Sequence, residues 1–321
     1  MISKIRFANL PTPVEPMQRL GAFLGGYKLW IKRDDLTGLA FGGNKARKLE
    51  FVLAEALANG AKTLVTVGGP QSNHCRQTAA LAARFGLRCI LVLSGEKPIP
   101  YTGNLLLDEL MGAEIVWCSQ QERSKVLNAT FEHEWEIGHR PFLIPLGAST
   151  PTGAIGYMRA IEELLQQDAV VPDWIVLASS SAGTQAGMAA EVKRRKLKIK
   201  ILGISIDQEA FHLQQNVAQL ATEAIERLGE KIVVSPDDVL VNADYRGGGY
   251  GVMGELEVNA VRLFAKLEGV LLGPVYTGRA AGGMIDLIQK GFFHTDESIL
   301  FWHTGDTPTL FADPYNRQLT Q

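Results

Sequence analysis

Short apolar runs and amphipathic helical stretches alternate along most of the chain, and this alternation limits the possible folds more than any other feature. The runs "TLVTVGG", "DWIVLASS" and "SILFWHTG" are nearly continuous in hydrophobic residues and end in small or turn-forming residues. Such runs are typical of strands buried on both faces of a parallel sheet. Parallel strands need crossover connections, which the helical stretches supply. We therefore predict an α/β fold.

The strand–helix units form two series. The first contains the predicted strands "TLVTVGG", "LRCILVLSG", "AEIVWC" and "PFLIP", and the second contains "DWIVLASS", "KIKILGISI" and "SILFWHTG". Between them, residues 146–157 ("LGASTPTGAIGY") are rich in turn formers, and we interpret them as the crossing between two domains. Ahead of the first series, "KLWIKRDD" alternates like an edge strand. In the second series, helices are expected after Ala182, Asp207 and Met253.

Charge and cysteine content exclude several classes of function. The 321 residues carry a formal net charge of −2, so no overall field attracts nucleic acid or an anionic membrane. The three cysteines form no CxxC pair, which argues against a zinc site or a disulfide framework and favours a reducing compartment. The N-terminus lacks the apolar core of a signal peptide, and the longest uncharged stretch, 141–158, is broken by turn residues. We expect a cytoplasmic protein with no metal, nucleic-acid or membrane partner.

The segment "GGNKARKLE" begins a well-specified helix. Asn44 is a favourable N-cap, apolar residues then recur at helical spacing, and an Asn-Gly pair supplies the stop. Lys45 therefore lies in the first turn, where the helix dipole disfavours a cation and would lower the lysine pKa. The neutral amine that results is the form that imine chemistry requires. A plain surface lysine is the alternative, and we interpret Arg47 and Lys48 as neighbours that tune Lys45 or are simply solvated.

In "ASSSAGTQAGM" a buried strand runs directly into a helix. Backbone N–H groups and the hydroxyls of Ser181 and Thr184 can converge there on an anion at the helix N-terminus. The segment matches neither GxGxxG nor GxxxxGK[ST], which argues against a dinucleotide enzyme and against a nucleotide hydrolase. A turn whose small residues serve packing alone is the other interpretation.

The segment "GGPQSNHCRQTAA" has the same layout and presents four polar side chains suited to a substrate carboxylate: Gln71, Ser72, Asn73 and His74. Ser72 or Asn73 also suits a helix cap, and capping and binding can coexist. His74 is either an acid–base group or a polar residue of the first turn. Later in the chain, a Gly/Pro-rich loop contains Tyr276, which either stacks on a flat cofactor or lies half-buried in the core.

Six segments, in this order, resemble the D-cysteine desulfhydrase and 1-aminocyclopropane-1-carboxylate deaminase family: "KRDDLTG", "FGGNKARKLE", "QSNHCRQTAA", "GTQAGM", "GPVYTGRA" and "FWHTG". Enzymes of this family use pyridoxal phosphate and have the tryptophan-synthase β fold, or fold type II. The resemblance implies two open, twisted, mostly parallel sheets covered by helices. It also implies a large cofactor domain from residues 1–47 and 153–321, a small α/β domain at 48–152, and a homodimer.

The resemblance assigns roles to individual residues. Lys45 would hold pyridoxal phosphate as a Schiff base and then remove the Cα proton of the substrate, with Ser72 and Tyr276 as the other catalytic residues. The cofactor would contact Lys45, Asn73, Ser181, Ala182, Gly183, Thr184, Thr277 and Thr304, with the phosphate at 181–184 and Asn73 on the pyridoxal hydroxyl. The substrate, a small amino acid, would contact Gln71, Ser72, Asn73, His74 and Tyr276.

Two positions favour the desulfhydrase branch of the family. The deaminase carries a glutamate after the motif tyrosine, whereas this chain has the neutral Thr277, with Thr304 alongside, so a fully protonated cofactor ring is disfavoured. His74 stands where the deaminase typically carries glutamine. The chain also departs from the family pattern at three positions: Pro70, Ala182 and Asp306.

We therefore expect a pyridoxal-phosphate-dependent lyase that performs β-elimination on a small amino acid, with D-cysteine converted to pyruvate, ammonia and hydrogen sulfide. The enzymatic alternatives are a 1-aminocyclopropane-1-carboxylate deaminase and a lyase acting on L-cysteate. A non-catalytic protein that binds pyridoxal phosphate or an amino acid is the alternative from another class. An NAD-dependent dehydrogenase is disfavoured, because the chain lacks GxGxxG with a trailing acidic residue.

Overall fold

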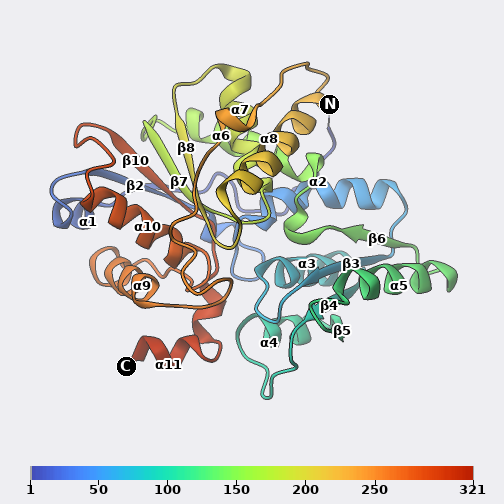
Figure 1. The fold of residues 1–321 in the computed structure, drawn as a ribbon. Coiled ribbons are helices and arrows are strands. Elements are labelled where there is room, and N and C mark those ends of the chain that lie inside the picture. The colour runs from blue at the N-terminus through green and yellow to red at the C-terminus, as the bar shows by residue number, and fades with distance from the viewer. Residues whose placement is uncertain (1, 321) are drawn as a thin grey trace.

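The computed structural model describes residues 2–320. The outermost residues of the predicted large domain, Met1 and Gln321, lie outside the described residues. The strands form two separate sheets, one of six strands and one of four, with helices packed against both (Figure 1). This architecture confirms the predicted α/β class with two mostly parallel sheets.

The larger sheet contains strands from both ends of the chain, in the order β1-β2-β10-β7-β8-β9. Only the β1–β2 pair is antiparallel. The strands are β1 (Val14–Pro16), β2 (Lys28–Arg33), β7 (Trp174–Ser179), β8 (Lys200–Ser205), β9 (Leu240–Asn242) and β10 (Ser298–His303). The prediction that "KLWIKRDD" forms an edge strand is wrong, because β1 covers the outer edge of β2. β1 is too short and too rich in flanking prolines to stand out in the sequence.

The smaller sheet is entirely parallel, in the order β5-β4-β3-β6. Its strands are β3 (Thr63–Gly68), β4 (Arg88–Ser94), β5 (Glu114–Cys118) and β6 (Pro141–Ile144), which are the four strands predicted for the first series. Every residue of β3 is buried, as its continuous apolar run predicts.

Eleven α-helices are described within residues 2–320. They are α1 (Gln18–Phe23), α2 (Lys45–Ala58), α3 (Asn73–Phe85), α4 (Gly103–Leu110), α5 (Arg123–Glu136), α6 (Pro151–Gln166), α7 (Gly183–Arg195), α8 (Ala210–Glu226), α9 (Glu255–Glu268), α10 (Thr277–Gln289) and α11 (Tyr315–Thr320). The 3₁₀ helices are η1 (Asp34–Leu36), η2 (Leu146–Ala148), η3 (Pro236–Asp238) and η4 (Thr307–Phe311). α2 packs against both α3 and α6, which places its N-terminus at the junction of the two sheets. None of the helices in this part of the chain is long and apolar enough to cross a membrane.

Two segments rich in turn-forming residues, the predicted domain crossing and the predicted loop around Tyr276, are partly helical. Most of residues 146–157 forms η2 and the start of α6, which Thr150 caps by accepting a 3.0 Å hydrogen bond from Gly153 N. The Gly/Pro-rich segment around Tyr276 leads into α10. Its glycines allow close helix packing, because a Cβ at Gly282 would lie 2.4 Å from the Leu256 side chain.

The interpretation of Arg47 and Lys48 as solvated residues is wrong, since both side chains are buried. Arg47 donates from Nε to Asp34 Oδ2 at 2.8 Å and from Nη1 to Glu163 Oε2 at 2.9 Å. Asp34 also accepts hydrogen bonds from three further side chains: Thr12, Tyr157 and Trp302. Arg47 therefore joins α2 to the larger sheet and to α6 through a buried ionic network.

Candidate active site

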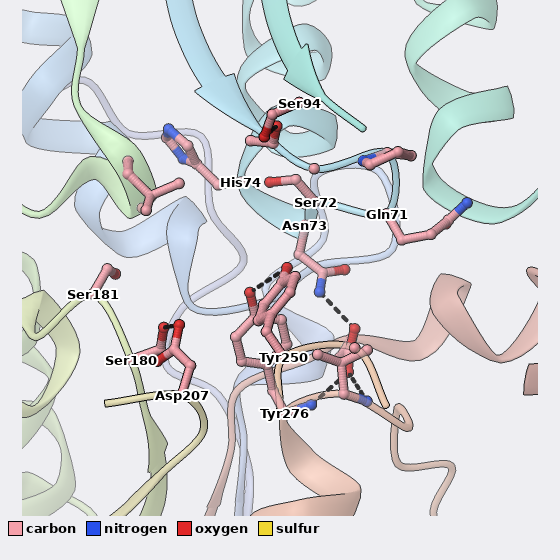
Figure 2. A pocket seen from close by; sticks show the side chains of 18 of the residues that line it. Gln71, Ser72, Asn73, His74, Ser94, Ser180, Ser181, Asp207, Tyr250 and Tyr276 are labelled. Carbon is pink, nitrogen blue, oxygen red and sulfur yellow. Dashed lines mark hydrogen bonds between the residues drawn. The ribbon is translucent and has the colours of Figure 1, made fainter. Parts of the chain in front are cut away.

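A cavity of about 770 Å³ lies where the carboxyl ends of strands from both sheets meet. Residues at the ends of five strands line it: Gly68, Ser94, Ser179, Asp207 and Thr304. Ligands of open α/β proteins bind at this edge of the sheet. Figure 2 shows polar side chains from these segments facing one another across the cavity. Within residues 2–320, no group of three or more His, Cys, Asp or Glu side chains is placed to hold a metal ion.

Lys45 is the first residue of α2, and its side chain lines the cavity. Desolvation lowers the pKa of Lys45 to about 8, while the nearby Asp306 charge opposes the shift and Arg76 adds to it. The predicted capping role of the Asn44 side chain is wrong. Instead, Asn44 Oδ1 accepts a 2.9 Å hydrogen bond from Lys45 Nζ, and Asn44 Nδ2 donates to Thr184 Oγ1 at 2.9 Å. Asn44 thereby connects the start of α2 to the start of α7.

The start of α7 forms an anion cradle, which we define as Ser149, Ser181, Gly183 and Lys48. Gly183 N donates to Ser149 Oγ at 3.3 Å, and Ser149 Oγ donates to Ser181 Oγ at 2.9 Å. A Cβ at Gly183 would lie 2.8 Å from Lys48 Nζ, so a larger residue would crowd the lysine. Lys48 Nζ donates to a backbone carbonyl at 3.1 Å and pairs with no carboxylate of the described residues. Burial lowers the pKa of Lys48, and a bound anion would supply its missing countercharge.

Ala182 holds the turn before α7 in a strained backbone conformation, with φ 66° and ψ −42°. Gly183 N donates to Ser181 O at 2.8 Å, which closes a γ-turn of the rare positive-φ kind. A β-carbon raises the energy of such a conformation, whereas glycine adopts it freely. The departure from the family pattern at Ala182 therefore has a conformational cost.

Replacing Ala182 with glycine is expected to raise the free energy of unfolding by about 1 kcal/mol, because relief of strain exceeds the added entropy of the unfolded chain. Urea denaturation measures the change. Ala186→Gly in the interior of α7 is the matched control, which should lower the free energy of unfolding by about 1 kcal/mol or more. A stability of Ala182→Gly equal to or below that of the parent chain would contradict the prediction.

Ser72 and Asn73 begin α3, and both line the cavity. Ser72 Oγ accepts a 3.2 Å hydrogen bond from Cys75 N, so Ser72 caps the helix, as one interpretation of the sequence proposed. Asn73 Oδ1 accepts from Arg76 Nη1 at 3.2 Å, and Asn73 Nδ2 donates to Asp306 Oδ1 at 2.6 Å (Figure 2). One N–H of the Asn73 amide is left for a ligand.

Gln71 and His74 also line the cavity; protein groups engage both polar atoms of the Gln71 side chain, but only Nε2 of His74, whose Nδ1 has no hydrogen-bond partner among the described residues. Gln71 Nε2 donates to Thr102 O at 2.9 Å, and Gln71 Oε1 accepts from Asn104 N at 2.8 Å. His74 Nε2 lies 2.8 Å from Thr66 Oγ1, whose own proton goes to a backbone carbonyl, so His74 Nε2 is the donor. Burial lowers the pKa of His74, with nearby lysine charges adding to the shift. His74 is therefore a neutral imidazole and not a cation.

Tyr276 pairs with a tyrosine that sequence reasoning missed. The hydroxyls of Tyr276 and Tyr250 lie 2.9 Å apart, and both rings line the cavity (Figure 2). Tyr250 comes from the loop "RGGGYG", whose run of glycines around one aromatic residue was the available signal. Desolvation raises the pKa of both phenols, so both are protonated donors at neutral pH.

Two predicted cofactor residues, Gly183 and Thr277, are not among the residues that line the cavity. The Thr277 hydroxyl instead accepts from Gly273 N at 2.8 Å and lies 3.2 Å from Gly305 O. Thr304 does line the cavity, and among residues 2–320 its backbone oxygen, not its hydroxyl, is the atom that is hydrogen-bonded. The cavity also brings together all of the other predicted residues: Lys45, Gln71, Ser72, Asn73, His74, Ser181, Ala182, Thr184 and Tyr276.

The lysine, the anion cradle and the fold together define a class of protein. Residues 5–305 match the profile of the family described as "Pyridoxal-phosphate dependent enzyme". The chain therefore belongs to this family, and its cofactor is pyridoxal phosphate. The predicted family resemblance is thereby confirmed.

Individual relatives show which members of this family the chain resembles. The chain is 41% identical, over 96% of its length and 95% of theirs, to the D-cysteine desulfhydrases of Salmonella typhimurium and Salmonella typhi. A solved structure described as an ACC deaminase homologue is 36% identical, with a TM-score of 0.91 over 99% of this chain and 96% of that one. A pyridoxal 5'-phosphate-dependent aspartate racemase, 17% identical with a TM-score of 0.66 over 92% and 90%, shares the fold.

Proposed function

We propose that this chain is a lyase that converts D-cysteine to pyruvate, ammonia and hydrogen sulfide by β-elimination. The observation that carries the proposal is the position of Lys45, whose pKa is lowered to about 8, in one cavity with Ser181, Ala182 and Thr184 at the start of α7. The choice of D-cysteine rests on the 41% identity to D-cysteine desulfhydrases over nearly the full length of both chains.

The residues around the cavity fit pyridoxal phosphate. The anion cradle would hold the phosphate, because Lys48 lacks an anionic partner and the N–H groups of α7 start there. Thr304 would meet the ring nitrogen as a neutral group, since its hydroxyl is free to hydrogen-bond. Bound pyridoxal phosphate supplies the electron sink that makes the Cα–H bond of an amino acid acidic.

The Asn73 amide is restricted to the role of a donor. Arg76 already holds its carbonyl oxygen, and Asp306 holds one of its two N–H groups. The second N–H would donate to the phenolic oxygen of pyridoxal phosphate, which is the predicted role of Asn73. Such a donor favours the charged form of that oxygen.

The remaining side chains would handle the protons and the substrate carboxylate. Lys45, as a neutral amine, would remove the Cα proton. Sulfur leaves Cβ with its bonding electrons as the Cα–Cβ double bond forms, and Tyr276 would protonate it, with Tyr250 resupplying the proton through their 2.9 Å contact. Ser72, at the N-terminus of α3, would bind the carboxylate. Water then hydrolyses the enamine to pyruvate and ammonia.

Ring opening of 1-aminocyclopropane-1-carboxylate is the second candidate activity, supported by the likeness to the ACC deaminase homologue. The decisive assay incubates the purified holoenzyme with D-cysteine, L-cysteine, L-cysteate and the cyclopropane acid. Pyruvate and sulfide from D-cysteine alone are the expected products. Oxobutyrate as the main product would move the proposal to the deaminase, and pyruvate with sulfite to the cysteate lyase. Bound cofactor without turnover of any substrate would leave only a binding protein.

The rate at which the apoprotein takes up pyridoxal phosphate is expected to rise as the pH increases through about 8. Only the neutral amine of Lys45 attacks an aldehyde, and desolvation lowers the pKa of Lys45 to about 8. Stopped-flow absorbance between pH 6 and 10 measures the rate. A rate that is still rising at pH 10, toward the ordinary lysine pKa of ~10.4, would show that the site leaves the lysine unperturbed.

The same proposal includes the domain division at 1–47, 48–152 and 153–321, a homodimer and a cytoplasmic location. The strands of the smaller sheet all fall within 48–152, which supports the division. Sedimentation velocity of the holoenzyme tests the homodimer, which should sediment as a particle of twice the 35.0 kDa chain mass.

A further inference from the structure

Asp306 follows β10 in a left-handed conformation, with φ 85°, and its carboxylate lines the cavity while only 2% of the residue is exposed. Oδ1 accepts from Asn73 Nδ2 at 2.6 Å and from Thr309 Oγ1 at 2.7 Å. Oδ2 accepts from Val275 N at 3.1 Å and from Tyr276 N at 3.0 Å. Four donors occupy the lone pairs of the carboxylate, so Asp306 acts on a ligand through position and charge and not by direct binding.

Three of these hydrogen bonds, from the Asn73 side chain and from the backbone N–H groups of Val275 and Tyr276, join opposite sides of the cavity. Asn73 belongs to α3 beside the smaller sheet, whereas Tyr276 precedes α10 beside the larger sheet. The fit is close, because a Cβ at Gly273 would lie 2.4 Å from Asp306 Cβ. Asp306 therefore links the Asn73 amide to the backbone of Tyr276, two residues that the proposed function uses.

All four partners of the Asp306 carboxylate are donors, which favours its ionised form. Burial raises the pKa of Asp306 above its ordinary value, and the hydrogen bonds from Thr309, Asn73 and two backbone N–H groups limit that rise. Lys45 and Arg76 are close enough for the Asp306 charge to raise the pKa of each. A buried carboxylate thus places a fixed negative charge beside the reacting groups.

The described residues that line the cavity include more acids than bases. The acids are Glu96, Asp207, Asp306 and Asp313, and the bases are Lys45 and Arg123. Asp306 is the one buried member of the acidic set, since the other three are exposed to solvent that screens their charge. Of these four acids, Asp306 is the one whose charge solvent screens least, and Lys45 is the cation near it in the cavity lining.

We propose that Asp306 is a specificity-determining residue that excludes amino acids whose β substituent is an anion. The proposal rests on the proposed function and deepens it. It restricts the substrates to those with an uncharged β substituent, such as a thiol or a chlorine atom. A sulfonate, as in cysteate, would meet the fixed charge of Asp306, whereas the buried cation Arg76 lies behind Asn73 and is not among the residues that line the cavity.

The test measures binding and needs no turnover. D-Asparagine and D-aspartate have nearly the same shape, but only aspartate carries an anionic β substituent. Isothermal titration calorimetry of the holoenzyme gives the dissociation constant of each. We expect the parent enzyme to bind D-asparagine at least about tenfold more tightly, and Asp306→Asn to bring the two constants within about threefold of each other. Asp306→Gly, which suits the left-handed backbone, serves as the second variant.

Asp207→Asn is the matched control, since Asp207 is an exposed acid of the same cavity. It should change the ratio of the two dissociation constants by less than about twofold. Equal or tighter binding of D-aspartate by the parent enzyme would overturn the proposal, and so would the absence of measurable D-asparagine binding. An unchanged ratio in both Asp306 variants, or an equal shift in Asp207→Asn, would also overturn it. Loss of D-cysteine turnover alone would count against the proposed function and not against this ratio.

Discussion

Replacing Lys45 with alanine is expected to lower kcat for the elimination by at least about 10³-fold and to abolish the visible absorption of the cofactor-bound protein. The variant loses the amine that holds pyridoxal phosphate covalently and also the base proposed to remove the Cα proton, and a positioned base contributes about 10²- to 10⁴-fold to a rate. Among the described residues the Nζ atom hydrogen-bonds only to Asn44, so truncation breaks one hydrogen bond and no ionic network. Absorbance after dialysis and steady-state pyruvate production are the two measurements.

Lys62, an exposed lysine that follows α2, provides the matched control. Lys62→Ala should keep both the absorption and the activity within about twofold of the parent enzyme, because its side chain is solvated. Added methylamine should restore part of the activity of Lys45→Ala, since a small amine can occupy the vacated space and accept the proton. Retained visible absorption together with activity within tenfold of the parent would refute the proposed role of Lys45.

The start of α2 shows how much of the candidate site could be predicted from the local sequence. The position of Lys45 in the first turn and the lowering of its pKa both follow from the sequence, although desolvation and not the helix dipole is the main cause of the shift. The local preference predicts that the Asn44 side chain caps α2. It instead donates a hydrogen bond to Thr184, a residue far along the chain. Local preference predicts where a helix begins, but tertiary contacts decide what the first side chains bind.

Residues that act through long-range contacts could not be predicted from spacing. Asp306 was noted only as a departure from a family pattern, yet it links Asn73 to the backbone of Tyr276. Arg76 appears in the sequence as a polar helix residue, but it is fully buried and holds the Asn73 carbonyl. A charge in a helix carries no signal of burial unless its partners are known.

There is a physical reason why a glycine-rich segment was wrongly predicted to be a loop. The segment around Tyr276 was predicted to be a Gly/Pro-rich loop, but its Gly282 and Gly283 lie within α10, where Leu256 and Tyr245 pack against them. Glycine lowers helix propensity by about 1 kcal/mol, so its presence favours a loop in any local reading. Tertiary packing offsets that cost here, because the close approach leaves no room for a side chain.

The burial of Arg47, and the stability that depends on it, could not be predicted from the local sequence either. Its side chain is only 2% exposed, and it bridges Asp34 and Glu163, whose side chains are 0% and 14% exposed. Burial alone would raise the pKa of Asp34, but the Arg47 charge and its hydrogen bonds lower it to about 2. The network thus depends on Arg47 to balance a carboxylate that solvent does not reach.

Replacing Arg47 with methionine is expected to lower the free energy of unfolding by about 3–5 kcal/mol, because the variant buries Asp34 without its cation. Urea denaturation of the apoprotein, followed by tryptophan fluorescence, measures the change without a contribution from the cofactor. Arg159→Met is the matched control. Arg159 pairs with Glu162 at the surface, with 50% of its side chain exposed, and its loss should cost no more than about 1 kcal/mol.

The difference in stability between the parent and Arg47→Met should depend on pH with a defined sign. The pKa of Asp34 falls from its ordinary value of 3.8 in an unfolded chain to about 2 in the fold, so its ionised form stabilises the parent fully above about pH 4. As the pH falls toward 2, Asp34 becomes protonated and no longer needs a cation, and the difference should shrink. A difference that is constant from pH 7 to pH 2 would show that Arg47 stabilises the fold by packing, and that the buried charge of Asp34 is not what it balances.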